Sequence, residues 1–252
     1  MKGMKEMGNY QKIFERKEVK YLLSYKQWES LLKQMEPFMK LDEYGKHLIS
    51  NIYYDTNTWY LARHSMSKPT YKEKVRVRSY GVPQMNEAVF LELKKKYKGI
   101  VYKRRTSMPL NRTERFLNHK KISLLTESNQ ILKEFQYVMA CYPDLKPAMY
   151  ISYERLAYLG KEDPNVRMTF DQNILYRTYD LSLAQGSYGK EILPEEKLLM
   201  EIKISGGMPL WLVNALTDLA IYPAKFSKFS TGYEDYLQTQ AKEKTEKEVC
   251  SA

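Results

Sequence analysis

Several segments of this 252-residue chain alternate charged and apolar side chains, residue by residue. The clearest is 71–79, where two valines alternate with Lys74, Arg76 and Arg78. Successive side chains of a β-strand point to opposite faces of the sheet. This segment is therefore predicted to be a strand with one apolar face and one basic face.

A Glu-x-Lys pair recurs in three segments of this kind, at Glu18/Lys20, Glu92/Lys94 and Glu201/Lys203. In an open sheet the polar face normally meets water, and that is one interpretation. The other is a closed barrel whose polar interior holds a ligand. Like charges inside a barrel repel unless a polyanion and a divalent cation lie between them. Arginine and lysine bind phosphate, and carboxylates bind Mg²⁺ or Mn²⁺, so the second interpretation predicts a phosphate-rich ligand.

Further strands and helices follow from the spacing of apolar residues. Ser24 with Gln27 forms a capping-box pattern at the start of the first helix. The expected helices are 25–38, 127–140 and 209–220, and the other expected strands are 19–23, 51–54, 89–95, 101–108, 149–159, 167–170 and 197–205. One α+β domain over 10–236 is predicted, with antiparallel strands and helices packed outside. Residues 237–252 are predicted to form a polar, solvated C-terminal tail.

The formal charge of +11 predicts an acidic partner: nucleic acid, a membrane surface or a phosphate-rich ligand. Nucleic acid is not expected, because many of the 22 tyrosines lie in strand patterns, where β-propensity and packing account for them. The two cysteines and three histidines have no disulfide or metal-ligand spacing. No run approaches the ~18 apolar residues of a membrane span. We expect a cytoplasmic protein, peripheral to a membrane only through a partner or its basic surface.

The charged strands resemble the motifs of the VTC (vacuolar transporter chaperone) domain. This family belongs to the triphosphate tunnel metalloenzymes, with the CYTH-type triphosphatases and class IV adenylyl cyclases. Eight segments carry the resemblance, in the family's order: 14–23, 74–78, 91–94, 103–105, 152–155, 166–171, 200–203 and 223–228. Each motif alone is weak, but together they span nearly the whole chain.

The resemblance implies an eight-stranded antiparallel β-barrel, a triphosphate tunnel open at both ends. It implies a polyphosphate polymerase, a phosphotransferase that uses Mn²⁺ or Mg²⁺ and moves the γ-phosphate of ATP onto a growing polyphosphate chain. Matching positions imply Lys20, Arg76, Arg78 and Glu201 as catalytic residues, with Glu201 as the metal ligand. The implied phosphate-binding residues are the first three of these with Lys94, Lys103, Arg155, Arg167, Lys203, Lys225, Ser227 and Lys228.

One position departs from the hydrolytic relatives, which begin with Glu-x-Glu-x-Lys. Arg16 stands at the first position here, which disfavours a two-metal hydrolase and favours retention of a polyanionic product. A triphosphatase or cyclase on the same tunnel, or a non-catalytic polyphosphate-binding module, are the alternatives. Eukaryotic relatives carry an SPX domain and membrane spans. We expect neither in this chain, and a membrane-protein partner is a further prediction.

Overall fold

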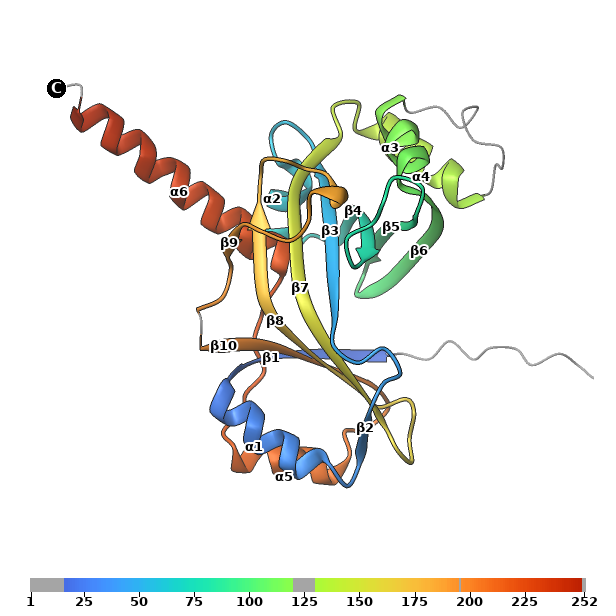
Figure 1. Ribbon diagram of the computed structural model, residues 1–252, viewed down its shortest axis with the longest axis vertical. Helices are drawn as coiled ribbons and strands as arrows, with labels where there is room; N and C mark the ends of the chain where they lie inside the picture. Colours follow the sequence, from blue (N-terminus) through green and yellow to red (C-terminus); the bar gives the residue numbers. More distant parts are fainter. Residues whose placement is uncertain (1–15, 120–129, 195, 251–252) are drawn as a thin grey trace, which may run out of the picture.

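The computed structural model describes residues 16–119, 130–194 and 196–250. The strands are β1 (Arg16–Ser24), β2 (Met39–Leu41), β3 (His47–Asp55), β4 (Tyr71–Tyr80), β5 (Ala88–Tyr97), β6 (Ile100–Pro109), β7 (Lys146–Gly160), β8 (Arg167–Arg177), β9 (Lys190–Glu191) and β10 (Lys197–Ser205). The helices are α1 (Tyr25–Met35), α2 (Tyr60–Met66), α3 (Leu110–His119), α4 (Gln130–Cys141), α5 (Leu210–Asp218) and α6 (Lys228–Cys250), with a 3-10 turn, η2 (Leu183–Gln185) (Figure 1). Each expected strand lies within an observed one. The first three residues of the expected helix 127–140 fall outside the described residues.

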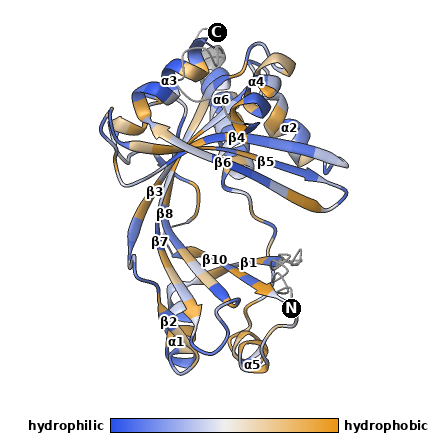
Figure 2. Cartoon of the chain, turned by 90° about the vertical axis from the view of Figure 1, so that its right-hand side faces the viewer, coloured by the Kyte–Doolittle hydropathy of each residue, from blue (hydrophilic) through white to orange (hydrophobic). Residues whose placement is uncertain are grey.

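Eight strands form one antiparallel sheet in the order β1-β10-β8-β7-β3-β4-β5-β6, and the short β2 and β9 pair with β7 and β8. The sheet curls strongly, so that β4–β6 and the β1–β10 pair face each other across its concave side (Figure 2). The α+β class and the eight antiparallel strands are confirmed. Hydrogen-bonded closure is not observed, because β1 and β6 are the two ends of the strand order and are not paired within the described ranges.

The edge of β1 that β6 leaves unpaired lies beside the segment around Pro223. Tyr21 forms an isolated antiparallel bridge with Pro223, and the Ala224 amide donates to the Lys20 carbonyl at 2.7 Å. This segment satisfies backbone groups that a neighbouring strand would otherwise satisfy.

The convex face of the sheet is apolar and covered by helices. Helices α1 and α5 bury Leu31 and Leu212 against β1, β8 and β10, and α1 begins with the expected Ser24–Gln27 capping box. Helices α3 and α4 bury Phe116 and Phe135 against the apolar face of β4 and β5. The predicted outer helices are therefore confirmed, because strand faces with apolar residues at every second position need such cover.

Helix α6 instead covers part of the concave face. Its Phe229 stacks on Tyr53 of β3, with ring centroids 4.5 Å apart, and both belong to a buried cluster with Met149 and Tyr233. Gly232 allows this contact, because a Cβ there would lie 2.9 Å from the Met149 sulfur. The concave face is thus apolar where α6 packs on it.

The predicted polar tail from residue 237 onward is helical, since α6 continues to Cys250. Its composition explains the helix, because Ala, Glu, Lys and Gln are strong helix formers even without an apolar stripe. Residues 240–245 are exposed. Of the helices in the described ranges, none is both long and apolar enough to cross a membrane.

Candidate functional site

The concave face encloses a cavity of about 300 Å³. Nine lysines and arginines line it against three glutamates. The described residues that line it are Glu18, Lys20, Tyr53, Lys74, Arg76, Arg78, Glu92, Lys94, Val101, Lys103, Tyr153, Arg155, Glu201, Lys203, Ser227 and Lys228. So large an excess of positive charge in one cavity indicates an anionic ligand.

Strand register brings these side chains together. Arg76 of β4 lies opposite Tyr53 of β3 and Glu92 of β5. Lys94 of β5 lies opposite Lys74 on one side and Lys103 on the other. The polar side chains of β3, β4, β5 and β6 therefore share the concave face, as their alternation predicts.

Glu92 of β5 forms ion pairs with cations of the two neighbouring strands, β4 and β6. It is almost fully buried, and one of its oxygens lies 2.6 Å from Arg76 Nη2, while the other lies 3.1 Å from Lys103 Nζ. Burial alone would raise the pKa of Glu92, but Arg76, Arg78 and Lys103 lower it to about 2. The carboxylate is thus ionised at neutral pH, and its charge is already balanced by cations of the protein.

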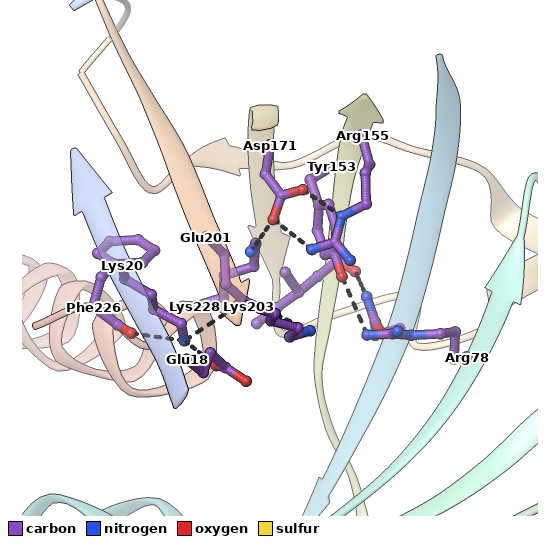
Figure 3. Close-up of polar contacts among 12 residues, drawn as sticks. Glu18, Lys20, Arg78, Tyr153, Arg155, Asp171, Glu201, Lys203, Phe226 and Lys228 are labelled. Atoms are coloured by element: carbon purple, nitrogen blue, oxygen red, sulfur yellow. Dashed lines mark hydrogen bonds and ion pairs between the residues drawn. The ribbon is translucent and has the colours of Figure 1, made fainter. Parts of the chain in front are cut away.

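Asp171 forms a second buried network, drawn in Figure 3. Its carboxylate accepts hydrogen bonds from Arg155 Nε at 2.6 Å and Nη2 at 2.8 Å, and from Lys228 Nζ at 2.5 Å. Although burial opposes ionisation, Lys228 and Arg155 hold the pKa of Asp171 far below its ordinary value. Asp171 therefore fixes the position of two cations that line the cavity.

Lys20 lies between two carboxylates, and this is the part of the cavity that could hold a metal ion. Its Nζ is 3.6 Å from a Glu18 oxygen and 3.8 Å from a Glu201 oxygen, and it donates to the Phe226 carbonyl at 3.2 Å (Figure 3). The other Glu201 oxygen lies 2.6 Å from Lys203 Nζ. Burial would raise the pKa of Glu201, but Lys203 and Lys20 lower it to about 2.

The donor set fits a divalent cation only in part. No group of three or more His, Cys, Asp or Glu side chains gathers anywhere in the chain as described. Glu201 and Glu18 offer two carboxylates, and Mg²⁺ or Mn²⁺ is commonly held by one or two carboxylates together with substrate phosphates and water. The residues present therefore suit a metal that arrives with a phosphate ligand.

Three cations of the cavity have no carboxylate within 4.0 Å among the described residues: Arg78, Lys74 and Lys94. Arg78 is buried and donates to two neutral groups, Asn51 Oδ1 at 2.8 Å and the Tyr153 hydroxyl at 3.1 Å. Lys74 donates to the Ser227 hydroxyl at 3.1 Å. A buried cation without a counter-ion is costly, so an anionic ligand would stabilise this arrangement.

The same charge excess perturbs two further groups. Burial and the neighbouring charges of Lys94 and Lys20 lower the pKa of Lys74 to about 8. Burial alone would raise the pKa of the Tyr53 phenol, but Arg76 and Lys74 lower it to about 7. The excess of positive charge in the cavity contributes to both pKa shifts, in addition to burial for Lys74.

Most of the predicted site residues lie together, and two do not. Lys20, Arg76, Arg78, Lys94, Lys103, Arg155, Glu201, Lys203, Ser227 and Lys228 line the cavity. Arg167 lies outside it, with about half of its side chain exposed and 3.6 Å from Asp42. Lys225 is exposed on the connection before α6 and lines an adjoining cavity.

Sequence reasoning left four groups out of the site: Lys74, Tyr53, Tyr153 and Asp171. The alternation in 71–79 placed Lys74 on the face of Arg76, so the signal for this lysine was available. No comparable signal marks the two tyrosines, since strands are rich in tyrosine for reasons of packing alone. Asp171 contacts Arg155 and Lys228, which are far from it in sequence, and only the fold joins the three.

A curled antiparallel sheet, with cations on its concave face and helices on its convex face, defines a tunnel-type, CYTH-like α+β fold. A protein of Hippeastrum proposed as an adenylyl cyclase, and reported to have a dominant triphosphatase activity, shares this fold with a TM-score of 0.54 and 18% identity. The similarity covers 86% of this chain and 95% of that protein. At this identity the likeness establishes the fold alone.

The chain belongs to the VTC domain family, whose model matches residues 15–236. No curated protein matches it in sequence. Two further solved structures align over most of the chain with TM-scores below 0.5. A proposed adenylate cyclase of Vibrio parahaemolyticus has a TM-score of 0.44, 13% identity and coverage of 89% of this chain and 98% of that one. The Mediator head module of Schizosaccharomyces pombe has a TM-score of 0.40, 10% identity and coverage of 81% and 90%.

Proposed function

We propose that this VTC domain is a polyphosphate polymerase, which transfers the γ-phosphoryl group of ATP to the end of a polyphosphate chain. The observation that carries the proposal is the charge of the cavity, where nine cations face three glutamates. Glu92 is already neutralised by Arg76 and Lys103. Such a site retains polyanions and offers few ligands for a two-metal hydrolytic centre.

The proposed roles follow from the contacts of each residue. Arg76 and Arg78 share one face of β4, so their guanidinium groups can bind neighbouring phosphates of the same chain. Glu201 is the proposed metal ligand, and Glu18 is a second oxygen donor nearby. The other cavity cations are proposed to bind phosphate: Lys20, Lys94, Lys103, Arg155, Lys203 and Lys228. Ser227 is proposed as a hydroxyl donor, and Lys225 and Arg167 as phosphate contacts outside the cavity.

The reaction forms a bond between a terminal phosphate oxygen of the chain and the γ-phosphorus of ATP, and it breaks the bond from that phosphorus to the bridging oxygen of ADP. The nucleophile is thus an oxygen of the polyphosphate substrate, and no side chain has to supply one. Phosphoryl transfer asks the protein chiefly for positioning and neutralisation of charge. A bound Mn²⁺ or Mg²⁺ would supply further neutralisation of phosphate oxygens. Among the described lining residues there is no cysteine or histidine, and Ser227 is the only one with an aliphatic hydroxyl.

A triphosphatase is the second candidate, because the Hippeastrum protein of the same fold is reported to have that activity. Incubation with ATP and Mn²⁺, followed by phosphorus NMR, separates the candidates. Signals of internal chain phosphates with release of ADP are expected. Orthophosphate with ADP, without signals of internal chain phosphates, would identify a triphosphatase, and cyclic nucleotide with pyrophosphate would identify a cyclase. Unchanged ATP, together with retained polyphosphate binding, would indicate a non-catalytic module.

A further inference from the structure

A second cavity, of about 830 Å³, adjoins the first. It lies beside the ends of β4 and β5, the end of α2 and the segment before α6, on the side where β1 and β6 are not paired. Six residues line both cavities: Glu18, Lys20, Lys74, Lys94, Val101 and Ser227. A ligand longer than the first cavity can therefore continue into the second.

The second cavity is basic in a different way from the first. Seven lysines and three glutamates line it, and among the described lining residues there is no arginine. Four of its lysines, Lys68, Lys72, Lys96 and Lys225, do not line the first cavity. Lysine is a flexible point charge that does not impose the fixed geometry of a guanidinium group. A cavity lined by lysines therefore suits a polyanion whose phosphate groups do not occupy fixed positions.

Lys72 and Lys96 extend the charged face of the β4–β5 hairpin outward. Lys72 lies opposite Lys96, and Lys74 opposite Lys94, so the four ammonium groups lie on the same face of two neighbouring strands. At about 3.3 Å per residue, Lys72 is roughly 20 Å along β4 from Arg78, farther than a triphosphate reaches. Lys72 and Lys96 are therefore beyond a short ligand bound at the arginines.

No carboxylate of the described chain lies within 4.0 Å of any of these four ammonium groups. Lys72 Nζ donates to the Ser65 carbonyl at 3.1 Å, a neutral partner. Burial and the charges of Lys96 and Lys94 lower the pKa of Lys72. Mutual repulsion of this kind raises the free energy of the unliganded protein, and bound phosphates would remove it.

We propose that this second cavity, the lysine groove, binds the part of a polyphosphate chain that extends beyond the central cavity, with Lys72 and Lys96 as its defining contacts. The inference rests on the proposed function, since it assigns the path of the same ligand. It adds a chain-length-dependent site that a triphosphate does not reach. Its position at the unpaired edge of the sheet gives the chain a lateral route out of the concave face.

The test compares Lys72→Gln/Lys96→Gln with wild type by calorimetry, in EDTA and without nucleotide. The ligands are tripolyphosphate and long-chain polyphosphate. The matched control is Lys26→Gln/Lys33→Gln, which removes the same charge from exposed positions of α1 on the convex side. We expect long-chain affinity to fall on the order of tenfold, and the slope of log affinity against log salt to fall by about 2. Tripolyphosphate affinity should change less than twofold.

Three results would overturn the lysine groove. The first is a loss of long-chain affinity no larger than in the α1 control. The second is an equal loss for tripolyphosphate, which would show that the two lysines act on the whole cavity. The third is a wild-type protein that binds a single-stranded oligonucleotide of matched charge more tightly than polyphosphate. The measurement needs no turnover, so a protein that makes no polymer can still show the groove, and an active polymerase can still lack it.

Discussion

Removing the charge of Asp171 is the most demanding test of the electrostatic reasoning. Its side chain is fully buried and holds Arg155 and Lys228, whose side chains are 14% and 12% exposed. Asp171→Asn keeps the shape but leaves two nearly buried cations without their counter-charge. Breaking a buried ion pair from one side costs about 3–5 kcal/mol. For a chain of this length, each kcal/mol lowers Tm by roughly 2–4 °C, so a fall of roughly 6–20 °C is expected.

A polyanion should restore much of this loss. In Asp171→Asn, Arg155 and Lys228 are free to bind phosphate oxygens, so tripolyphosphate should raise Tm more in the variant than in wild type. A ligand at a hundredfold excess over its dissociation constant stabilises by about 2.7 kcal/mol, and tighter binding adds to this. Thermal unfolding followed by circular dichroism, with and without tripolyphosphate, measures both effects.

Two further variants make the test specific. Asp218→Asn removes a charge from an exposed position of α5 and should change stability by less than about 0.5 kcal/mol. Arg155→Met in the Asp171→Asn background removes one unpaired cation and should recover part of the loss, giving a clear coupling energy. An Asp171→Asn protein that unfolds within 2 °C of wild type, or a ligand gain equal in both proteins, would refute the reasoning.

Three other outcomes follow from the same cavity. Arg76→Ala/Arg78→Ala should abolish tripolyphosphate binding in calorimetry while the circular dichroism spectrum is kept, since each charge-assisted contact contributes roughly 1.5–3 kcal/mol; unchanged affinity would contradict the assignment. Glu201→Gln should eliminate turnover at limiting Mn²⁺ while metal-free tripolyphosphate binding stays equal or tightens, and wild-type turnover would place the metal elsewhere. Because the pKa of Tyr53 is lowered to about 7 from an ordinary value near 10, the unfolded chain binds the extra proton between these values, and stability should rise with pH across that window. Tyr53→Phe should flatten this rise and remove a tyrosinate absorbance step near pH 7, and an unaltered titration would contradict the assignment.

The strand faces were determined by the sequence alone. Side chains alternate along any strand, so a run such as 71–79 places Arg76 and Arg78 on one face whatever its neighbours are. The same local argument correctly predicted the apolar stripes of the outer helices and the capping box at Ser24. It also predicted many antiparallel strands with helices, and the resemblance of the motifs to the VTC family implied that the strands number eight.

Tertiary structure decided which of these charges are neutralised. Asp171 compensates Arg155 and Lys228, and Glu92 compensates Arg76, through contacts between strands or with a helix. Arg78 has no carboxylate within 4.0 Å among the described residues, although it lies on the same face of β4 as Arg76. A charge's partner depends on register and curl across the sheet, and neither is encoded in a local run of residues.

Tertiary structure also decided the shape of the concave face. Segment 223–226 lies along the edge of β1, and Phe229 of α6 packs on Tyr53 within the sheet's concavity. The sequence around Gly232 has no apolar stripe long enough to reveal this packing, because only the first turns of α6 are buried. The curl of the sheet, the position of α6 and the lysine groove all depend on long-range packing, in which burial of apolar surface outweighs local preference.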